Sequence, residues 1–242
     1  MKIIKNDKLI DRNAKISNYL SIGSLIVMAG VIYFAIQTLS GDPTKITLQN
    51  QYLLIGLVVV SMLLTSVGNQ MSKNFGRSPR PDERIDAALK GLPGDTTVYH
   101  YTTPASHLLV GPAGIWVIIA STVLGKASYS KNRWRLSGGG FAQGYLRFFG
   151  QEGIGRPDVE ADSDIKSLQK EFAKHMDVEQ IPPISALLVF TDENVELDTA
   201  DAPMPAMKVK QIKDFMRQKA KEKPLSTEEI ERIKSIFPQA KE

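Results

Sequence analysis

Two long stretches without a charged side chain constrain this 242-residue chain more than any other feature. The first runs from Ile16 to Gly41 and the second from Ile46 to Ser72. A helix needs about 20 mostly apolar residues to cross the ~30 Å hydrocarbon core of a bilayer, and each stretch supplies them. We therefore expect a transmembrane hairpin within residues 19–72, with spans at about 19–38 and 50–71.

Two other interpretations of these stretches stay open. They could be core helices of a soluble domain, although such a domain rarely holds two uncharged runs of this length. The first could be a cleaved signal peptide, although its apolar run is longer than a signal peptide needs and a second run follows it.

The charge distribution indicates an orientation for the hairpin. The chain has a net charge of +4. Residues 1–18 have a net charge of +3 and residues 72–84 a net charge of +2, whereas the charges of Asp42 and Lys45 cancel within residues 40–51. Lys and Arg accumulate on the cytoplasmic side of membrane proteins. We expect a multi-pass protein of the cell membrane with both termini in the cytoplasm, and the lipid bilayer as its first partner.

Several kinds of chemistry have no support in the sequence. The chain has no Cys, which excludes disulfides, thiolate metal sites and a cysteine nucleophile. No phosphate-binding glycine motif is present, and the three histidines lack the spacing of a metal site. We expect no cofactor and no metal.

The rest of the chain alternates short β-type and helical patterns. We interpret residues 1–18 as a basic cytoplasmic N-terminus, 73–81 as a linker, 82–220 as a cytoplasmic domain and 221–242 as a C-terminal helix. Compact apolar runs predict strands, and 3.6-residue periodicity predicts helices. The strands are expected at 97–101, 107–110, 115–119, 126–129, 133–136, 186–190 and 207–209, and the helices at 85–92, 158–175, 212–220 and 227–237. This order is typical of an α/β domain with a mixed sheet flanked by helices.

A basic and aromatic cluster stands out between residues 126 and 156. Its basic members are Lys126, Lys131, Arg133, Arg135, Arg147 and Arg156, and its aromatic members are Tyr129, Trp134, Phe141, Tyr145, Phe148 and Phe149. Cations neutralise phosphates and aromatic faces stack on bases, so single-stranded nucleic acid or an anionic lipid surface is one possible ligand. The alternative is a solvated hairpin with the aromatic side chains packed beneath it.

The segment from His107 to Ile118, with Gly111-Pro112-Ala113-Gly114 before an apolar strand, resembles the NERD (nuclease-related) domain family. The similarity covers roughly residues 82–220 and implies a restriction-endonuclease-like core. In that family an acid before the hairpin and a Glu-x-Lys motif hold a divalent metal and activate water. The corresponding positions here are Ser106, Ile119 and Ser121, and a family Gln falls near Glu160.

The chain therefore departs from the family at all three central catalytic positions. A hydroxyl and an aliphatic side chain do not replace two carboxylates as magnesium ligands. Asp95, Glu83 or Glu160 could in principle supply acids to a relocated site.

The sequence thus leads to three competing functions. We expect an integral membrane protein whose NERD-like domain has lost nuclease chemistry and serves as a binding or scaffold module, for nucleic acid or a cytoplasmic protein. The first alternative is a metal-dependent nuclease with a relocated active site. The second is a membrane-associated structural or assembly protein without nucleic-acid contact.

Overall fold

A computed structural model of the chain describes residues 1–40, 47–138 and 153–239, and it divides into two compact units. One unit is Lys8–Arg80, and the other combines Met1–Asp7 with Pro81–Glu242. We call the first the helical hairpin and the second the sheet unit.

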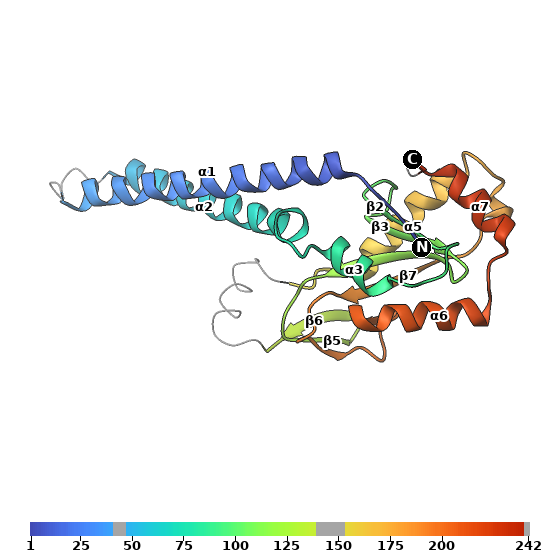
Figure 1. Cartoon of the computed structure of the whole chain (residues 1–242). Coiled ribbons are helices and arrows are strands. Elements are labelled where there is room, and N and C mark those ends of the chain that lie inside the picture. The colour runs from blue at the N-terminus through green and yellow to red at the C-terminus, as the bar shows by residue number, and fades with distance from the viewer. Residues whose placement is uncertain (41–46, 139–152, 240–242) are drawn as a thin grey trace. The chain divides into compact units, whose positions relative to one another are not determined.

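The helical hairpin consists of α1 (Asp7–Ser40) and α2 (Leu48–Met71), which lie side by side (Figure 1). Small residues allow this approach. Gly68 packs against Leu20 and Ser21, and the Ser61 hydroxyl donates a hydrogen bond to the Ser24 carbonyl at 3.2 Å. A π-helical turn, Ser72–Gly76, follows α2.

Both helices are long and apolar enough to cross a membrane. Only 11% of the most apolar window of each helix is buried, whereas the core helix of a soluble protein would be mostly buried. Apolar side chains such as Leu25, Ile26 and Leu63 stand exposed along them.

The main sheet of the sheet unit has six strands in the order β1-β2-β3-β4-β7-β9. The strands are β1 (Lys2–Lys5), β2 (Thr97–His100), β3 (His107–Gly111), β4 (Gly114–Ser121), β7 (Ile184–Phe190) and β9 (Ala206–Lys208). β2, β3 and β4 are antiparallel neighbours, while the β1–β2, β4–β7 and β7–β9 pairs are parallel. The sheet is therefore mixed, as the sequence predicts.

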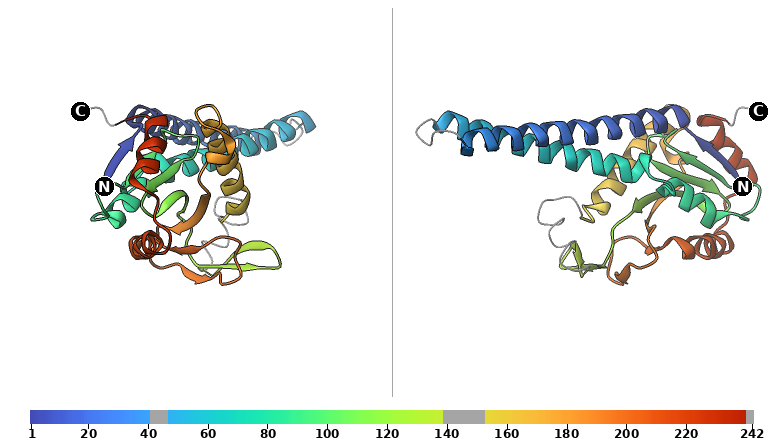
Figure 2. Two further views of the ribbon diagram at one scale, coloured as in Figure 1. Left: turned by 90° about the vertical axis from the view of Figure 1, so that its right-hand side faces the viewer. Right: turned by 60° about the vertical axis from the view of Figure 1, so that its left-hand side comes forward.

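A second, smaller sheet has the order β6-β5-β8. Its strands are β5 (Lys126–Ser130), β6 (Arg133–Ser137) and β8 (Glu196–Asp198). The β5–β6 hairpin turns through Lys131 and Asn132, both at positive φ, which is the geometry of a two-residue hairpin turn. The β5–β6 hairpin and the C-terminal helix α7 (Thr227–Ile236) lie at opposite ends of the sheet unit (Figure 2).

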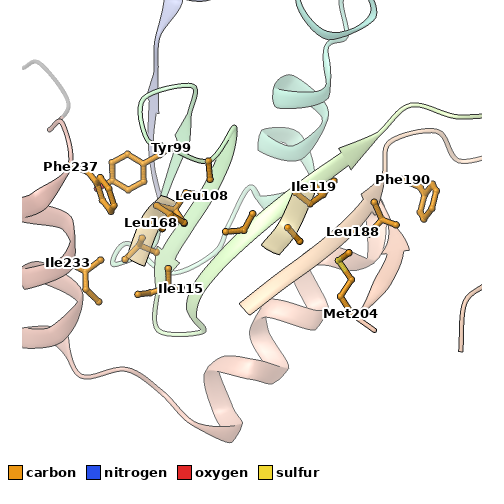
Figure 3. Packing of buried hydrophobic residues seen from close by; sticks show 14 of the residues in the cluster. Tyr99, Leu108, Ile115, Ile119, Leu168, Leu188, Phe190, Met204, Ile233 and Phe237 are labelled. Atoms are coloured by element: carbon orange, nitrogen blue, oxygen red, sulfur yellow. The ribbon is translucent and has the colours of Figure 1, made fainter. Parts of the chain in front are cut away.

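Helices cover both faces of the main sheet. On one face α3 (Pro81–Leu89) and α6 (Ile212–Glu222) share a hydrophobic cluster with Leu109, Trp116 and Leu187. On the other face α5 (Pro157–Phe172) and α7 (Thr227–Ile236) share a larger cluster, shown in Figure 3. Strands β2, β3, β4 and β7 alternate their side chains between the two clusters, as strands buried on both sides require.

Strand β1 has no counterpart among the strands that the sequence predicts. Its four residues pair with β2 from Lys2 opposite Thr97 to Lys5 opposite His100. Ile4 is buried in the larger cluster, while Ile3 is 40% exposed. The residues before α1 are thus part of the same sheet as residues that follow α2.

Candidate functional site

Ser106, Ile119 and Ser121, which the resemblance to the NERD family aligns with its metal site, have different surroundings. Ser106 is exposed in the turn before β3, and Ser121 ends β4, where its carbonyl accepts a hydrogen bond from the Thr191 backbone N–H at 2.9 Å. Ile119 is 4% exposed and lies among the buried side chains of the larger cluster (Figure 3). Its position can hold an apolar side chain without cost, and a charged one only at a large cost.

The acids named for a relocated site do not come together. Glu83 lies on α3 and Glu160 on α5, and these helices pack on opposite faces of the main sheet. Asp95 is exposed in the loop before β2. Within the part of the chain that the structure describes, no three His, Asp or Glu side chains group so that they could hold a metal ion.

Glu160 does have an acidic neighbour, Asp164, one turn further along α5. Loss of hydration and the Asp164 carboxylate raise the pKa of Glu160. Loss of hydration also raises the pKa of Asp164, although a hydrogen bond from the Ser106 backbone partly offsets this. The structure therefore places Ser106 beside a pair of acids on α5.

The basic residues of the β5–β6 hairpin share one face of the small sheet. Residues directly opposite in an antiparallel pair point to the same side of the sheet, and so do alternate residues of one strand. The opposed pairs Lys126–Ser137, Ser128–Arg135 and Ser130–Arg133 therefore all lie on one face. Lys126, Arg133 and Arg135 are exposed on this face, and Lys131 is exposed at the turn. Arg147 lies outside the described residues.

The aromatic residues of the hairpin point the other way. Tyr129 lies opposite Trp134 with ring centroids 5.1 Å apart, and both belong to the larger hydrophobic cluster. These two rings pack beneath the hairpin, which agrees with the alternative of a solvated hairpin over packed aromatic side chains. Acids of β8 also reach the basic face, since the Asp198 carboxylate lies 3.4 Å from the Lys126 ammonium. Phe141, Tyr145, Phe148 and Phe149 lie outside the described residues.

A buried polar network, which the sequence analysis missed, joins β1, α3, β2 and β3. The Lys5 ammonium contacts Asp82 at 3.1 Å and also contacts Asp86. The second Asp86 oxygen lies 2.9 Å from Nε2 of His100, and Nδ1 of His100 lies 2.8 Å from Nδ1 of His107. Asp82 and His100 have no exposed side-chain surface.

The charges of this network depend on one another. Burial opposes the charge on Lys5, but hydrogen bonds to Asp86 and Asp82 outweigh it and raise the pKa of Lys5. Burial and the adjacent His100 lower the pKa of His107 to about 3, so this ring is neutral at pH 7.

The contact between the two imidazoles requires one Nδ1 to donate and the other to accept. His100 donates to the Asp86 carboxylate through Nε2. With its proton on Nε2, a neutral His100 accepts a hydrogen bond at Nδ1 from the Nδ1–H group of His107. The arrangement binds Lys5, at the end of β1, to the first two turns of α3.

Part of this network has a signal in the sequence. His100 and His107 are directly opposed in the β2–β3 hairpin, and two histidines that flank a short turn are natural partners. Lys5 has no such signal, because 77 residues separate it from Asp82.

Comparisons of the chain with protein-family models, curated proteins and solved structures find no match. The resemblance to the NERD family thus stays a prediction, and the function has to be argued from the geometry.

Proposed function

We propose that the chain is an integral membrane protein that holds a non-catalytic, NERD-like binding or scaffold module at the cytoplasmic face of the cell membrane. One observation carries this proposal. Strand β1 precedes α1, its partner β2 follows α2, and both belong to one sheet. A folded unit lies on one side of a bilayer, so the two helices cross together or not at all.

The exposed apolar surface of both helices favours crossing. Charge then favours the orientation, because basic residues flank the hairpin at its outer ends and the connection between the helices carries no net charge. The sheet unit, with both chain ends, is therefore assigned to the cytoplasm.

The loss of nuclease chemistry is supported by Ile119. Its side chain packs in the larger cluster, at the position where the resembling family has a metal-binding Glu. The outward basic face of the β5–β6 hairpin supplies a surface for phosphates, and nucleic acid or an acidic protein segment is the matching partner class.

A nuclease with a relocated site is the second candidate. The pair Glu160 and Asp164 beside Ser106 favours it, because coupled acids with raised pKa values are frequent in active sites.

Single cysteines test the topology, and the absence of native Cys makes every label specific. Gln49→Cys, at the start of α2, should react with a membrane-impermeant maleimide in intact cells. Ser137→Cys, exposed on β6, should react only after the membrane is opened. Reaction of Ser137→Cys in intact cells would overturn the orientation, and protection of both positions would overturn the crossing.

The full chain in lipid nanodiscs can be used to test whether the sheet unit cleaves nucleic acid or only binds it. Incubation with nucleic acid and Mg²⁺ or Mn²⁺ should give no cleavage. Retention of nucleic acid that weakens with salt and with Arg133→Gln/Arg135→Gln would identify the partner class. Metal-dependent cleavage that Glu160→Gln abolishes would instead establish the nuclease.

A further inference from the structure

A cavity of about 400 Å³ opens between α6, the loop before β2 and the β3–β4 turn. Its walls are apolar: Leu92 and Pro93 come from the loop, Leu109 from β3, Ala113 from the turn, and Met216 and Ala220 from α6. The volume lies at the lower end of the range for small-molecule sites, which is about 300–1,000 Å³. It is suited to one apolar chain rather than two.

Hydrogen bonds fix the walls of this cavity. The Trp116 indole donates to the Ala113 carbonyl at 2.8 Å, which holds the β3–β4 turn against the sheet. The Leu225 backbone N–H donates to the Pro112 carbonyl at 3.2 Å, and that of Thr96 donates to the Pro93 carbonyl at 3.1 Å. A cavity with such walls is largely formed before any ligand arrives.

The charged residues that line the cavity are both basic and both exposed. Arg217 and Lys221 stand one turn apart on α6, and the described lining contains no carboxylate. Asp214 lies 3.6 Å from Arg217, but both side chains are more than half exposed, so the pair is weak. An apolar cavity with cations only at its mouth matches a ligand that has an apolar body and an anionic end.

We propose that this cavity binds a single-chain carboxylate amphiphile of the fatty-acid type. The chain occupies the space between Leu109 and Met216, and the carboxylate contacts Arg217 and Lys221. The forked guanidinium of Arg217 suits the two oxygens of a carboxylate. This proposal is independent of the orientation of the helical hairpin and of the fate of the nuclease chemistry.

The test uses the full chain in nanodiscs, because detergents are themselves amphiphiles. A decanoic acid that carries a photoreactive diazirine is titrated, irradiated and mapped by peptide mass spectrometry. Saturable labelling should fall on peptides that contain Leu109 or Met216. Unlabelled decanoate should compete, and decanol, which has the same chain without charge, should compete more weakly.

Variants test the two halves of the site separately. Arg217→Gln/Lys221→Gln should raise the half-saturating concentration about tenfold, since two exposed charge contacts are lost. Lys219→Gln is the matched control, because Lys219 is on the same helix but pairs with Glu222 and does not line the cavity. Ala220→Leu should reduce the labelling by filling the cavity.

Four results would overturn the proposal. Labelling that does not saturate, or that maps to peptides outside the cavity, would show that the cavity is not the binding site. Equal competition by decanol and decanoate, or an unchanged titration in the Arg217→Gln/Lys221→Gln variant, would show that the two basic residues do not bind the carboxylate of the ligand.

Discussion

At the scale of single residues, Lys5 holds two acids of α3 that lie 77 and 81 positions away in the chain. Lys5→Gln keeps much of the side-chain volume and removes the charge that faces the buried Asp82. We expect the free energy of unfolding to fall by about 2 kcal/mol, less than for a fully buried pair because Lys5 is partly exposed. Thermal unfolding in nanodiscs should shift down by about 5 °C.

Lys2→Gln is the control for this prediction, because Lys2 lies on the same strand and is exposed. An equal shift in the two variants would mean that Lys5 acts only through the general charge of the N-terminus.

His107 gives a prediction about pH. Its pKa is about 3 in the folded protein and about 6.5 when unfolded, so the unfolded chain binds more protons between these values. The stabilising effect of the neutral ring is therefore complete above pH 6.5 and is lost as pH falls from 6.5 toward 3. The slope should approach about 1 kcal/mol for each pH unit.

His107→Gln keeps a hydrogen-bonding group and removes the titration, so it should flatten this slope. His175→Gln, at an exposed histidine of the segment after α5, should leave it unchanged. Parallel pH profiles for the native chain and His107→Gln would contradict the prediction.

Ile119 allows a prediction of what a carboxylate would cost at this buried position. Ile119→Glu places a carboxyl in the larger cluster, and we expect it to cost several kcal/mol, on the order of 3 or more. Ile119→Val removes one methylene at the same position and should cost about 1 kcal/mol. Denaturant unfolding of both variants measures the difference, and a cost for Ile119→Glu as small as that for Ile119→Val would show that this position reaches water.

At the scale of elements, β1 has two faces that can be told apart. Ile4→Ser removes a buried side chain and should lower the free energy of unfolding by about 2 kcal/mol, whereas Ile3→Ser, on the exposed face, should change little. Hydrogen exchange should show that the backbone amides of residues 2–6 lose protection in Ile4→Ser only. Equal loss of protection in both variants would mean that β1 is held only by its backbone hydrogen bonds to β2.

The elements that the sequence predicts share strong local signals. The uncharged runs give α1 and α2, the Gly-Pro-x-Gly turn gives the β3–β4 hairpin, and the periodicity of residues 158–175 gives α5. Strands β1 and β8 have no such signal. Each has only three or four residues, and each forms because a distant strand edge is available, which a local pattern does not contain.

The same distinction holds for the candidate site. The sequence predicts the exposed basic residues of the β5–β6 hairpin, because charge is a local property. It leaves open where Tyr129 and Trp134 point, since that depends on the cluster beneath them. The contacts of Lys5 and the cavity beside α6 both need segments that are far apart in sequence, so they emerge only from the fold.

At the scale of the whole molecule, the sheet unit is built from two separate parts of the chain. A fragment of residues 81–242 lacks β1, which exposes the edge of β2 and leaves Asp82 and Asp86 without Lys5. Joining residues 1–7 to residue 81 through about 15 Gly and Ser residues restores both. We expect the joined protein to be soluble and to unfold cooperatively, and the short fragment to be less stable and to associate through its free edge.

Thermal unfolding and sedimentation of the two proteins measure this prediction. A short fragment that is as stable and as monomeric as the joined protein would mean that β1 is an accessory to the sheet.

The pairing of β1 also has a consequence for biosynthesis. Strand β1 leaves the ribosome before α1 and α2, and β2 is made about ninety residues later. At about 5–20 residues per second, strand β1 waits roughly 5–20 s for β2 to be synthesised. On the proposed topology both apolar helices enter the bilayer during that interval. Strand β1 can then pair with β2 only after both helices have been made, so closure of the sheet follows insertion of the helical hairpin.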